Sequence, residues 1–349
     1  MLDVKDLTAD ELENLLLNLG ENRYRAAQIT KWAYRFAATS FDEMTNISKK
    51  FKEKLSKHFY ISLLNPAKEL KSKDGTRKYL FKLEDESLIE SVLIPEISRL
   101  TLCISTQAGC KLGCKFCLTG KGRFIRNLKT AEIINQICSI KDSLPESEKI
   151  SNIVLMGMGE PLANYNNTLN ALRIITDPVG LQFSPRKVTL STAGLVPEIK
   201  RLGKDTNVNL AVSLNATEDR TRDYLMPINR KYPLDTLLKA CREYPLPTRK
   251  RITFEYILIK GINDSIDDAK RLVNILKGIR CKINLISFNE YPCSEFKSPD
   301  REAINTFQQV LINSNYTSII RASKGTDILA ACGQLGGQQP QQGEANLFL

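Results

Sequence analysis

The stretch CISTQAGCKLGCKFCLTG, from Cys103 to Gly120, contains four of the nine cysteines of this 349-residue chain. Three of them follow the spacing Cys110-x3-Cys114-x2-Cys117. A structural zinc site requires four protein ligands, and the single histidine of the chain lies in another region. A [4Fe–4S] cluster held by only three thiolates leaves one iron open to a small molecule. The spacing therefore predicts a reactive cluster on these three thiols. A structural metal site with Cys103 as fourth ligand is the alternative.

Beyond Leu100, short β-rich segments alternate with segments of helical periodicity. The β-rich segments are 100–106, 152–157, 187–192, 208–214, 251–259, 282–288 and 316–322. The helical segments are 130–142, 165–176, 235–244, 267–279 and 301–314. This alternation predicts an α/β fold with βαβ units and a parallel sheet, closed into a full or partial (β/α) barrel. A doubly wound open sheet is the alternative, and in both folds ligands bind at the carboxyl ends of the strands.

Small polar residues follow several of the predicted strands. In MGMGEP, Gly157 and Gly159 allow close backbone approach, and the Glu160 carboxylate can meet an ammonium group. Other strand ends contribute Ser191, Ser213, Asn215 and Asn289. We expect these residues to line one ligand, although each could instead only cap a helix. The cysteine spacing, with an aromatic residue before the last cysteine, is typical of radical S-adenosylmethionine (SAM) enzymes, in which the open iron binds SAM.

The N-terminal region is predicted to be helical and basic. Residues Thr8 to Glu11 fit a capping box at the start of a first helix, and further helices are expected at 23–36 and 49–59. Between Lys49 and Lys82 there are 11 Lys/Arg against three Asp/Glu, in a chain whose net charge is +11. This excess indicates a surface for nucleic-acid phosphates, with a merely solvated helix face as the alternative.

We expect three parts of the chain. Residues 1–82 form a helical, basic accessory domain with a strand extension, 83–335 the catalytic core, and 336–349 a flexible Gly- and Gln-rich tail. The first residues lack the apolar core of a secretory signal, and no apolar run reaches the roughly 18 residues of a membrane helix. The sequence therefore predicts a cytoplasmic protein with no membrane partner. We expect ordinary thiols at Cys138, Cys241, Cys281 and Cys293.

Eight segments together resemble a known family, the RlmN/Cfr radical SAM RNA methyltransferases, and its RlmN branch more closely. In chain order they are GCKLGCKFCLTG, RNLKTAEI, LMGMGEPLANY, TLSTAGLVP, MPINRKYPL, EYILIKGIND, INLISFN and ACGQL. The resemblance implies a partial barrel of the radical SAM type with a small N-terminal RNA-binding domain. It also implies one [4Fe–4S] cluster, SAM, and methylation of C2 of an adenosine in 23S rRNA, at the peptidyl-transferase centre, and in tRNA next to the anticodon.

The resemblance assigns roles to further residues. Cys332 of ACGQL matches the cysteine that one SAM methylates, after which a second SAM on the cluster yields the radical that activates the S-methyl group. Glu90 matches the base that removes the C2 proton, and Cys103 matches the thiol that attacks the Cys332 sulfur, forms a disulfide and frees the product. The cluster ligands implied are Cys110, Cys114 and Cys117. The SAM contacts implied are Gly159, Glu160, Ser191, Ser213, Leu214, Asn215 and Asn289.

Two positions depart from the family pattern, and two other functions compete. Asn215 replaces the usual histidine, and Ser323–Asp327 replaces a more acidic, arginine-containing segment. The competing functions are C8 methylation of the same rRNA adenosine, as in Cfr, and a non-catalytic RNA-binding protein stabilised by a metal or cluster. The second would need a fourth protein ligand and would have no use for Cys332. The expected partners are 23S rRNA, tRNA and an external, flavodoxin-like electron donor; the catalytic set is complete in one chain, so a monomer suffices.

Overall fold

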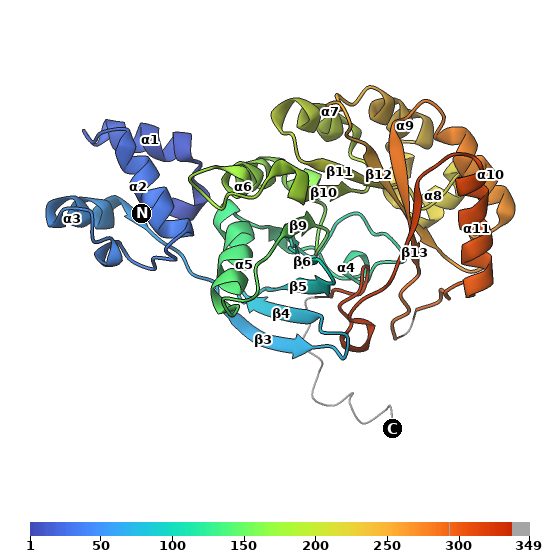
Figure 1. The fold of residues 1–349 in the computed structure, drawn as a ribbon, viewed down its shortest axis with the longest axis horizontal. Coiled ribbons are helices and arrows are strands. Elements are labelled where there is room, and N and C mark those ends of the chain that lie inside the picture. The colour runs from blue at the N-terminus through green and yellow to red at the C-terminus, as the bar shows by residue number, and fades with distance from the viewer. Residues whose placement is uncertain (293, 337–349) are drawn as a thin grey trace.

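One ten-stranded sheet organises the chain in this computed structural model, which describes residues 1–292 and 294–336 (Figure 1). The predicted tail beyond residue 336 and the thiol of residue 293 lie outside the described residues. From edge to edge the strands are β14 (Ser318–Arg321), β13 (Cys281–Ser287), β12 (Ile252–Leu258), β11 (Asn209–Ser213), β10 (Val188–Thr192), β9 (Asn152–Leu155), β6 (Arg99–Cys103), β5 (Leu88–Glu96), β4 (Arg77–Lys82) and β3 (Pro66–Lys71).

The strand order explains why the sheet forms a partial barrel. β6 and β9 to β14 are parallel and lie side by side in their order along the chain. A doubly wound sheet would instead reverse direction at a switch point, so that alternative is wrong. The edge strands β3 and β14 do not pair with each other in the described chain, and the barrel stays open. The predicted α/β fold of the radical SAM type is confirmed.

Helices cover the outside of the parallel strands (Figure 1). They are α5 (Thr130–Ser143), α6 (Tyr165–Thr176), α7 (Val196–Asp205), α8 (Asp219–Leu225), α9 (Leu234–Arg242), α10 (Ile266–Ile275) and α11 (Arg301–Asn313). The five helices expected from periodicity are present, whereas α7 and α8 were not anticipated. The core between helices and sheet is apolar: Leu190, Val212 and Phe254, from three adjacent strands, are all fully buried.

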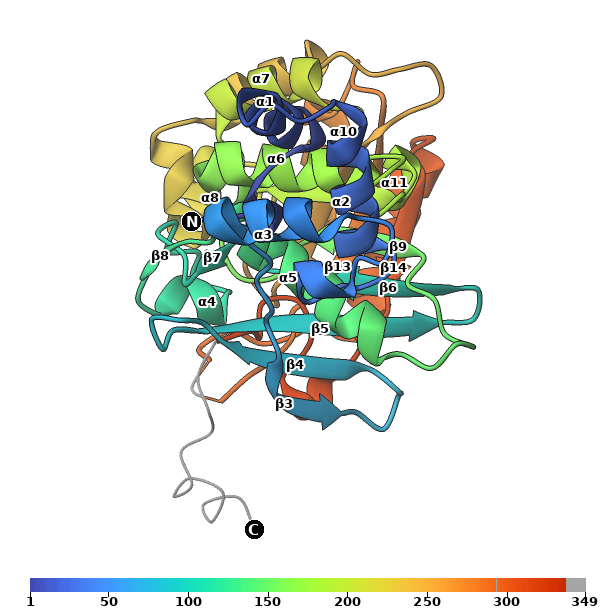
Figure 2. The same ribbon diagram turned by 90° about the vertical axis from the view of Figure 1, so that its left-hand side faces the viewer.

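The N-terminal helices form a lobe at one end of the molecule, beside α5 and α6 (Figures 1 and 2). The lobe comprises β1 (Leu2–Asp3), α1 (Ala9–Asn18), α2 (Tyr24–Tyr34), α3 (Lys49–His58) and β2 (Phe59–Tyr60). The predicted capping box of α1 is confirmed, since Thr8 N–H donates to Glu11 Oε2 (2.8 Å) and Glu11 N–H to Thr8 Oγ1 (3.3 Å).

Between the lobe and the parallel strands, the chain forms an antiparallel extension of the sheet. β4 pairs with β5 through contacts such as Leu80 opposite Glu90, and β3 pairs with β4. The expected domain boundary at residue 82 therefore falls inside this pairing, and β3 and β4 are hydrogen-bonded into the same sheet as the parallel strands. A separate two-stranded ribbon flanks the cysteine-rich loop. Its strands are β7 (Gln107–Ala108), before the loop, and β8 (Arg126–Asn127), after it, and the short helix α4 (Leu118–Lys121) lies between them in the chain.

Candidate active site

Two glycines allow the cysteine-rich loop to fold tightly between β7 and α4. Gly109 has a φ of +80°, and a Cβ at this position would lie 2.1 Å from the carbonyl oxygen of Arg123. A Cβ on Gly120 would lie 2.9 Å from the carbonyl oxygen of Cys114. Larger residues would therefore push the loop open at both points. The close approach brings the three spaced cysteines around one cavity.

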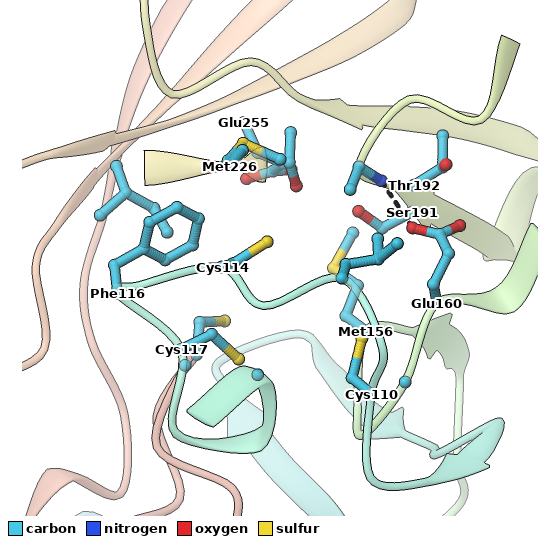
Figure 3. A pocket seen from close by; sticks show the side chains of 18 of the residues that line it. Cys110, Cys114, Phe116, Cys117, Met156, Glu160, Ser191, Thr192, Met226 and Glu255 are labelled. Carbon is cyan, nitrogen blue, oxygen red and sulfur yellow. Dashed lines mark hydrogen bonds between the residues drawn. The ribbon is translucent and has the colours of Figure 1, made fainter. Parts of the chain in front are cut away.

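Cys110, Cys114 and Cys117 line this first cavity, which has a volume of about 160 Å³ (Figure 3). Burial raises the pKa of all three thiols, that of Cys110 to about 12. For Cys114, the negative charges of the other two thiolates raise the pKa further. Three buried thiols that repel one another as thiolates require a cationic partner before they can ionise together.

The geometry fits a cluster better than a single metal ion. Within the described residues, no three His, Cys, Asp or Glu side chains are grouped so that they could hold one ion. Thiolates of a [4Fe–4S] cluster each bind a different iron, so they surround a common space without meeting at one point. A four-ligand zinc site that includes Cys103 finds no support in the described part of the chain, because Cys103 does not line this cavity and shares the neighbouring one with Cys117 but not with Cys110 or Cys114.

Glu160 lines the first cavity together with the three cysteines and is held by the backbone (Figure 3). Its Oε2 accepts a hydrogen bond from Ala193 N–H (2.7 Å) and its Oε1 one from Leu162 N–H (3.0 Å). Burial raises the pKa of Glu160 to about 7, although these hydrogen bonds oppose the rise. The neighbouring Gly159 has φ +99°, and a Cβ there would lie 2.5 Å from the side chain of Gln107. The carboxylate is thus fixed in direction and can accept a cationic ligand.

Ser191 and Ser213, at the carboxyl ends of β10 and β11, line the same cavity. The two residues that follow Ser213 do not. Leu214 and Asn215 are fully buried, and Asn215 is among neither cavity's lining residues. Its Oδ1 accepts a hydrogen bond from Ile257 N–H (2.8 Å), and its amide nitrogen donates to the Met226 sulfur (3.3 Å). Asn215 therefore acts here as an internal tie between strand and loop.

A second cavity of about 130 Å³ adjoins the first and contains two of the predicted catalytic cysteines. Cys103, at the end of β6, and Cys332, on the loop after β14, both line it as free thiols. Asn289 also lines it, and its side-chain amide donates to Cys332 O (3.0 Å). The fold thus brings together two thiols that are more than two hundred positions apart in the sequence.

Cys332 lies in the wall that the two cavities share, because it lines both. The residue is exposed, unlike the buried Cys103. Loss of hydration among the protein atoms around the thiol, and next the negative charge of Glu255, raise the pKa of the Cys332 thiol. Glu255 lines both cavities as well, and its Oε1 accepts a hydrogen bond from the side chain of Asn284 (2.9 Å). A thiol at this position can be reached from either cavity.

Glu90 lies under the C-terminal loop and is not among the residues lining either cavity. It is 3 % exposed. Its Oε1 lies 3.0 Å from Lys78 Nζ, and its Oε2 accepts a hydrogen bond from Gly336 N–H (2.9 Å). Lys78 Nζ also donates to Leu329 O (3.2 Å). In this conformation the carboxylate is engaged by the loop on which Cys332 lies.

Sequence reasoning missed two charged residues near the cavities. Glu255 interrupts the apolar strand segment ITFEYIL, and a lone carboxylate in a buried strand could have indicated it. Arg222, on α8, is fully buried beside the first cavity, but its segment EDRTRDYL reads as an exposed polar helix. No local pattern distinguishes it from its exposed neighbour Arg220.

Comparison with known proteins agrees with this geometry. Residues 2–61 match the family described as the ribosomal RNA large subunit methyltransferase N-terminal domain, and residues 104–273 match the radical SAM superfamily. The dual-specificity RNA methyltransferase RlmN of Syntrophus aciditrophicus is 55 % identical, over 97 % of each chain. The chain belongs to the RlmN family of radical SAM RNA methyltransferases. The RlmN of Geobacter sulfurreducens is 56 % identical over 97 % of this chain and 93 % of its own.

Solved structures place the RlmN-family chain in the same fold. A radical SAM methyltransferase from Sphaerobacter thermophilus superimposes with a TM-score of 0.90 and 42 % identity, over 97 % of this chain and 100 % of its own. As a member of the RlmN family the chain is a SAM-dependent methyltransferase whose cofactors are a [4Fe–4S] cluster and SAM. The cofactors and the enzyme class expected from the sequence are confirmed. Among the described helices, none has the length and apolar character needed to cross a bilayer.

Proposed function

We propose that the protein methylates C2 of an adenosine in 23S rRNA and in tRNA, with Cys332 as methyl carrier. The observation that supports this most directly is the place of Cys332 in the wall between the two cavities. The first cavity holds the cluster cysteines and Glu160, and the second holds Cys103. A methyl group can thus be received on one side and presented to a nucleobase on the other.

The cofactors would be held by residues of the first cavity. Cys110, Cys114 and Cys117 would bind the cluster, while Glu160 and the hydroxyl groups of Ser191 and Ser213 would bind SAM. Bound together, the cluster and SAM supply a carbon radical that can abstract hydrogen from an otherwise unreactive methyl group. The protein's part is to hold the Cys332 sulfur within reach of that chemistry and to keep bulk water out.

Release of the product would use the second thiol. Cys103 lines the same cavity as Cys332, and thiol exchange requires such access. Glu90 remains our candidate for the base that takes the C2 proton. Because Gly336 N–H and Lys78 now engage its carboxylate, this role requires the loop from Leu329 to Gly336 to move when RNA binds.

RNA would be held by the basic charge around the cavity entrance and on the N-terminal lobe. Lysines of the cysteine-rich loop and α4 lie over aromatic rings, namely Lys111 over Phe124 (4.4 Å), Lys115 over Tyr224 (3.8 Å) and Lys121 over Tyr291 (5.2 Å). Such lysines can contact phosphates around an unstacked base. RNA substrates support a cytoplasmic site of action. A single chain contains every proposed catalytic residue, so a monomer with an external one-electron donor suffices.

The test is nucleoside mass spectrometry after incubation of the anaerobically reconstituted enzyme with SAM, a reductant and unmodified 23S rRNA or tRNA. We expect 2-methyladenosine from the wild type and from the control Cys281→Ala, which alters a buried thiol that lines neither cavity. Cys332→Ala should yield none. A product methylated at C8 would contradict the regiochemistry, and no product from cluster-loaded enzyme would contradict the proposed substrates. Zinc without iron after anaerobic purification would favour the non-catalytic RNA-binding alternative.

A further inference from the structure

Arg222, on α8, is a buried cation that the proposed reaction does not use. Its side chain has no exposed surface, and it is the largest side chain buried to this extent among the described residues. Removing a guanidinium from water is costly unless hydrogen bonds and a nearby negative charge replace its hydration. The surroundings of Arg222 therefore indicate what compensates its charge.

Three hydrogen bonds of Arg222 go to backbone carbonyl oxygens at or just beyond the ends of β10 and β11. Nη2 donates to Ala193 O (2.7 Å) and Ser213 O (3.2 Å), and Nε donates to Leu214 O (3.0 Å). Ala193 and Ser213 both line the first cavity. Arg222 thus ties together the ends of β10 and β11, but carbonyl dipoles alone do not neutralise a full charge.

In the described part of the chain, no carboxylate forms an ion pair with Arg222. Nη1 donates to Asn229 Oδ1 (2.9 Å), and the Asn229 amide in turn donates to Asp219 (2.8 Å) and Asp223 (2.7 Å). Asp219 is exposed and Asp223 half-buried, so water screens both carboxylates. The buried charge therefore lacks a buried counter-ion in the protein alone.

The cysteine-rich loop packs against the end of α8. Lys115 N–H, next to Cys114 in the chain, donates to Leu225 O (3.0 Å), and Met226 and Cys114 line the same cavity (Figure 3). Among the anionic groups around Arg222, the Cys114 thiolate raises the pKa of the guanidinium most, although burial lowers it to about 10. The guanidinium therefore lies behind the cavity wall against which the cysteine-rich loop packs, and Cys114 would become a buried anion beside it once a cluster ionises the thiol.

We propose that Arg222 is a positioning residue that supplies the counter-charge for the [4Fe–4S] cluster and thereby raises its reduction potential. The proposal rests on the cluster assigned above to the three cysteines. A cluster with three thiolates is anionic and gains one more negative charge when an external one-electron donor reduces it. A fixed positive charge in a medium of low dielectric constant stabilises the reduced form more than the oxidised form. Without Arg222, reduction should be harder.

The experiment is a redox titration of the reconstituted full-length protein, followed by electron paramagnetic resonance of the reduced cluster. Arg222→Gln and Arg222→Met remove the charge, Arg222→Lys keeps it with fewer hydrogen-bond donors, and Arg220→Met is the control on an exposed arginine of the same helix. At the wild-type midpoint, we expect the ratio of reduced to oxidised cluster to fall about tenfold in the neutral variants. In the Lys variant and in the control, this ratio should stay close to the wild-type value.

Each outcome of this experiment tests either the role of Arg222 or the proposed function. If the neutral variants load a cluster with the wild-type midpoint, Arg222 is only a structural tie and the proposal is wrong. The same conclusion follows if neither neutral variant folds or retains a cluster. If the ratio of reduced to oxidised cluster falls as far in the Lys variant as in the neutral variants, the hydrogen bonds rather than the charge set the reduction potential, which also contradicts the proposal. Failure of the wild type itself to bind an iron–sulfur cluster would instead contradict the proposed function.

Discussion

Glu160 shows how burial and backbone hydrogen bonds prepare one carboxylate for a cationic ligand. Both oxygens accept backbone N–H groups, from Ala193 and Leu162, and each keeps a lone pair for a further partner. Burial raises its pKa to about 7, because the charged form loses hydration that no cation in the described chain replaces. The ammonium group of SAM would supply that missing charge. Two predictions follow from this one side chain.

The first concerns SAM affinity. Glu160→Gln removes the negative charge while nearly preserving shape, so we expect SAM to bind at least about tenfold more weakly, the loss typical of a charge-assisted hydrogen bond. In the wild type, affinity should also weaken as the pH falls below about 7, because protonation neutralises the carboxylate. Equilibrium dialysis with cluster-loaded protein measures both effects. Glu302→Gln, at an exposed position of α11, is the control, and equal affinity in Glu160→Gln and wild type would contradict the assignment.

The second concerns stability. An acid whose pKa rises from its ordinary value of 4.5 to about 7 on folding stabilises the folded state below pH 4.5 and loses that contribution as the pH rises through 7. Relative to Glu160→Gln, the cluster-free wild type should therefore lose up to about 3 kcal/mol of unfolding free energy between pH 5 and pH 8. Urea unfolding of both proteins at these pH values tests this. A difference that does not depend on pH would show that the carboxylate ionises normally.

At the scale of elements, the loop that presents Cys332 is anchored by the β3–β4 turn. Gly325 N–H donates to Asp74 Oδ2 (2.9 Å), and Ser72 Oγ donates to Asp327 Oδ1 (2.6 Å). Gly325 has φ +66°, and a Cβ there would lie 2.8 Å from Ala330, so the loop turns sharply against the hairpin. The position of Cys332 therefore depends on a hairpin some 250 residues earlier in the chain.

We predict that Asp74→Ala loosens this loop. The Gly325 N–H would lose its acceptor, and backbone amides of the segment from Ala322 to Leu335 should exchange with deuterium several-fold faster in the cluster-free protein, because local opening limits their exchange. Mass spectrometry of peptides from this segment after timed exchange measures the rate. Glu146→Ala, an exposed carboxylate on the loop after α5, should leave the rate unchanged. Unchanged exchange in Asp74→Ala would mean that other contacts hold the loop.

At the scale of the whole molecule, a buried lysine joins the N-terminal lobe to the core. Lys5 is 2 % exposed, and its Nζ donates to Asn135 Oδ1 on α5 (2.7 Å) and to Ser62 O (2.9 Å). Beside it, Asp6 Oδ1 accepts a hydrogen bond from Ala131 N–H at the start of α5 (2.7 Å). These contacts fix the basic lobe relative to the core, as the proposed binding of one RNA by both would require.

Lys5→Met should weaken this junction. The buried Asn135 Oδ1 and the half-buried Ser62 O would lose their donor, and we expect the free energy of unfolding to fall by about 2 kcal/mol. Brief trypsin treatment should also release the lobe faster than in the wild type. Lys57→Met, at an exposed position of α3, is the matched control and should behave like the wild type in both measurements. An unaltered unfolding free energy and cleavage rate in Lys5→Met would show that apolar packing alone holds the lobe.

Local sequence patterns were sufficient to predict most helices and strands, and also the site residues that lie at strand ends or in one short loop. The spaced cysteines, Glu160, Ser191 and Ser213 all reach one cavity, because a loop or strand end places them there. Local patterns were insufficient where a side chain's direction depends on distant packing. Asn215 follows a strand like its neighbours but turns inward to Ile257 N–H, and Glu90 lies under the C-terminal loop. α7 was missed although Val196, Ile199 and Leu202 recur at helical spacing, and α8 is a mostly polar helix of seven residues.

The sequence by itself determined that this chain has a three-thiol cluster loop and strands alternating with helices. Ligand spacing and periodicity are properties of neighbouring residues, so both can be recognised without a fold. Only the tertiary structure decided that Cys103 and Cys332 share a cavity and that Cys332 also faces the cluster cysteines. It also decided that Arg222 is buried while Arg220 is exposed. These facts depend on the order and curvature of the strands, which bring together residues that no local pattern connects.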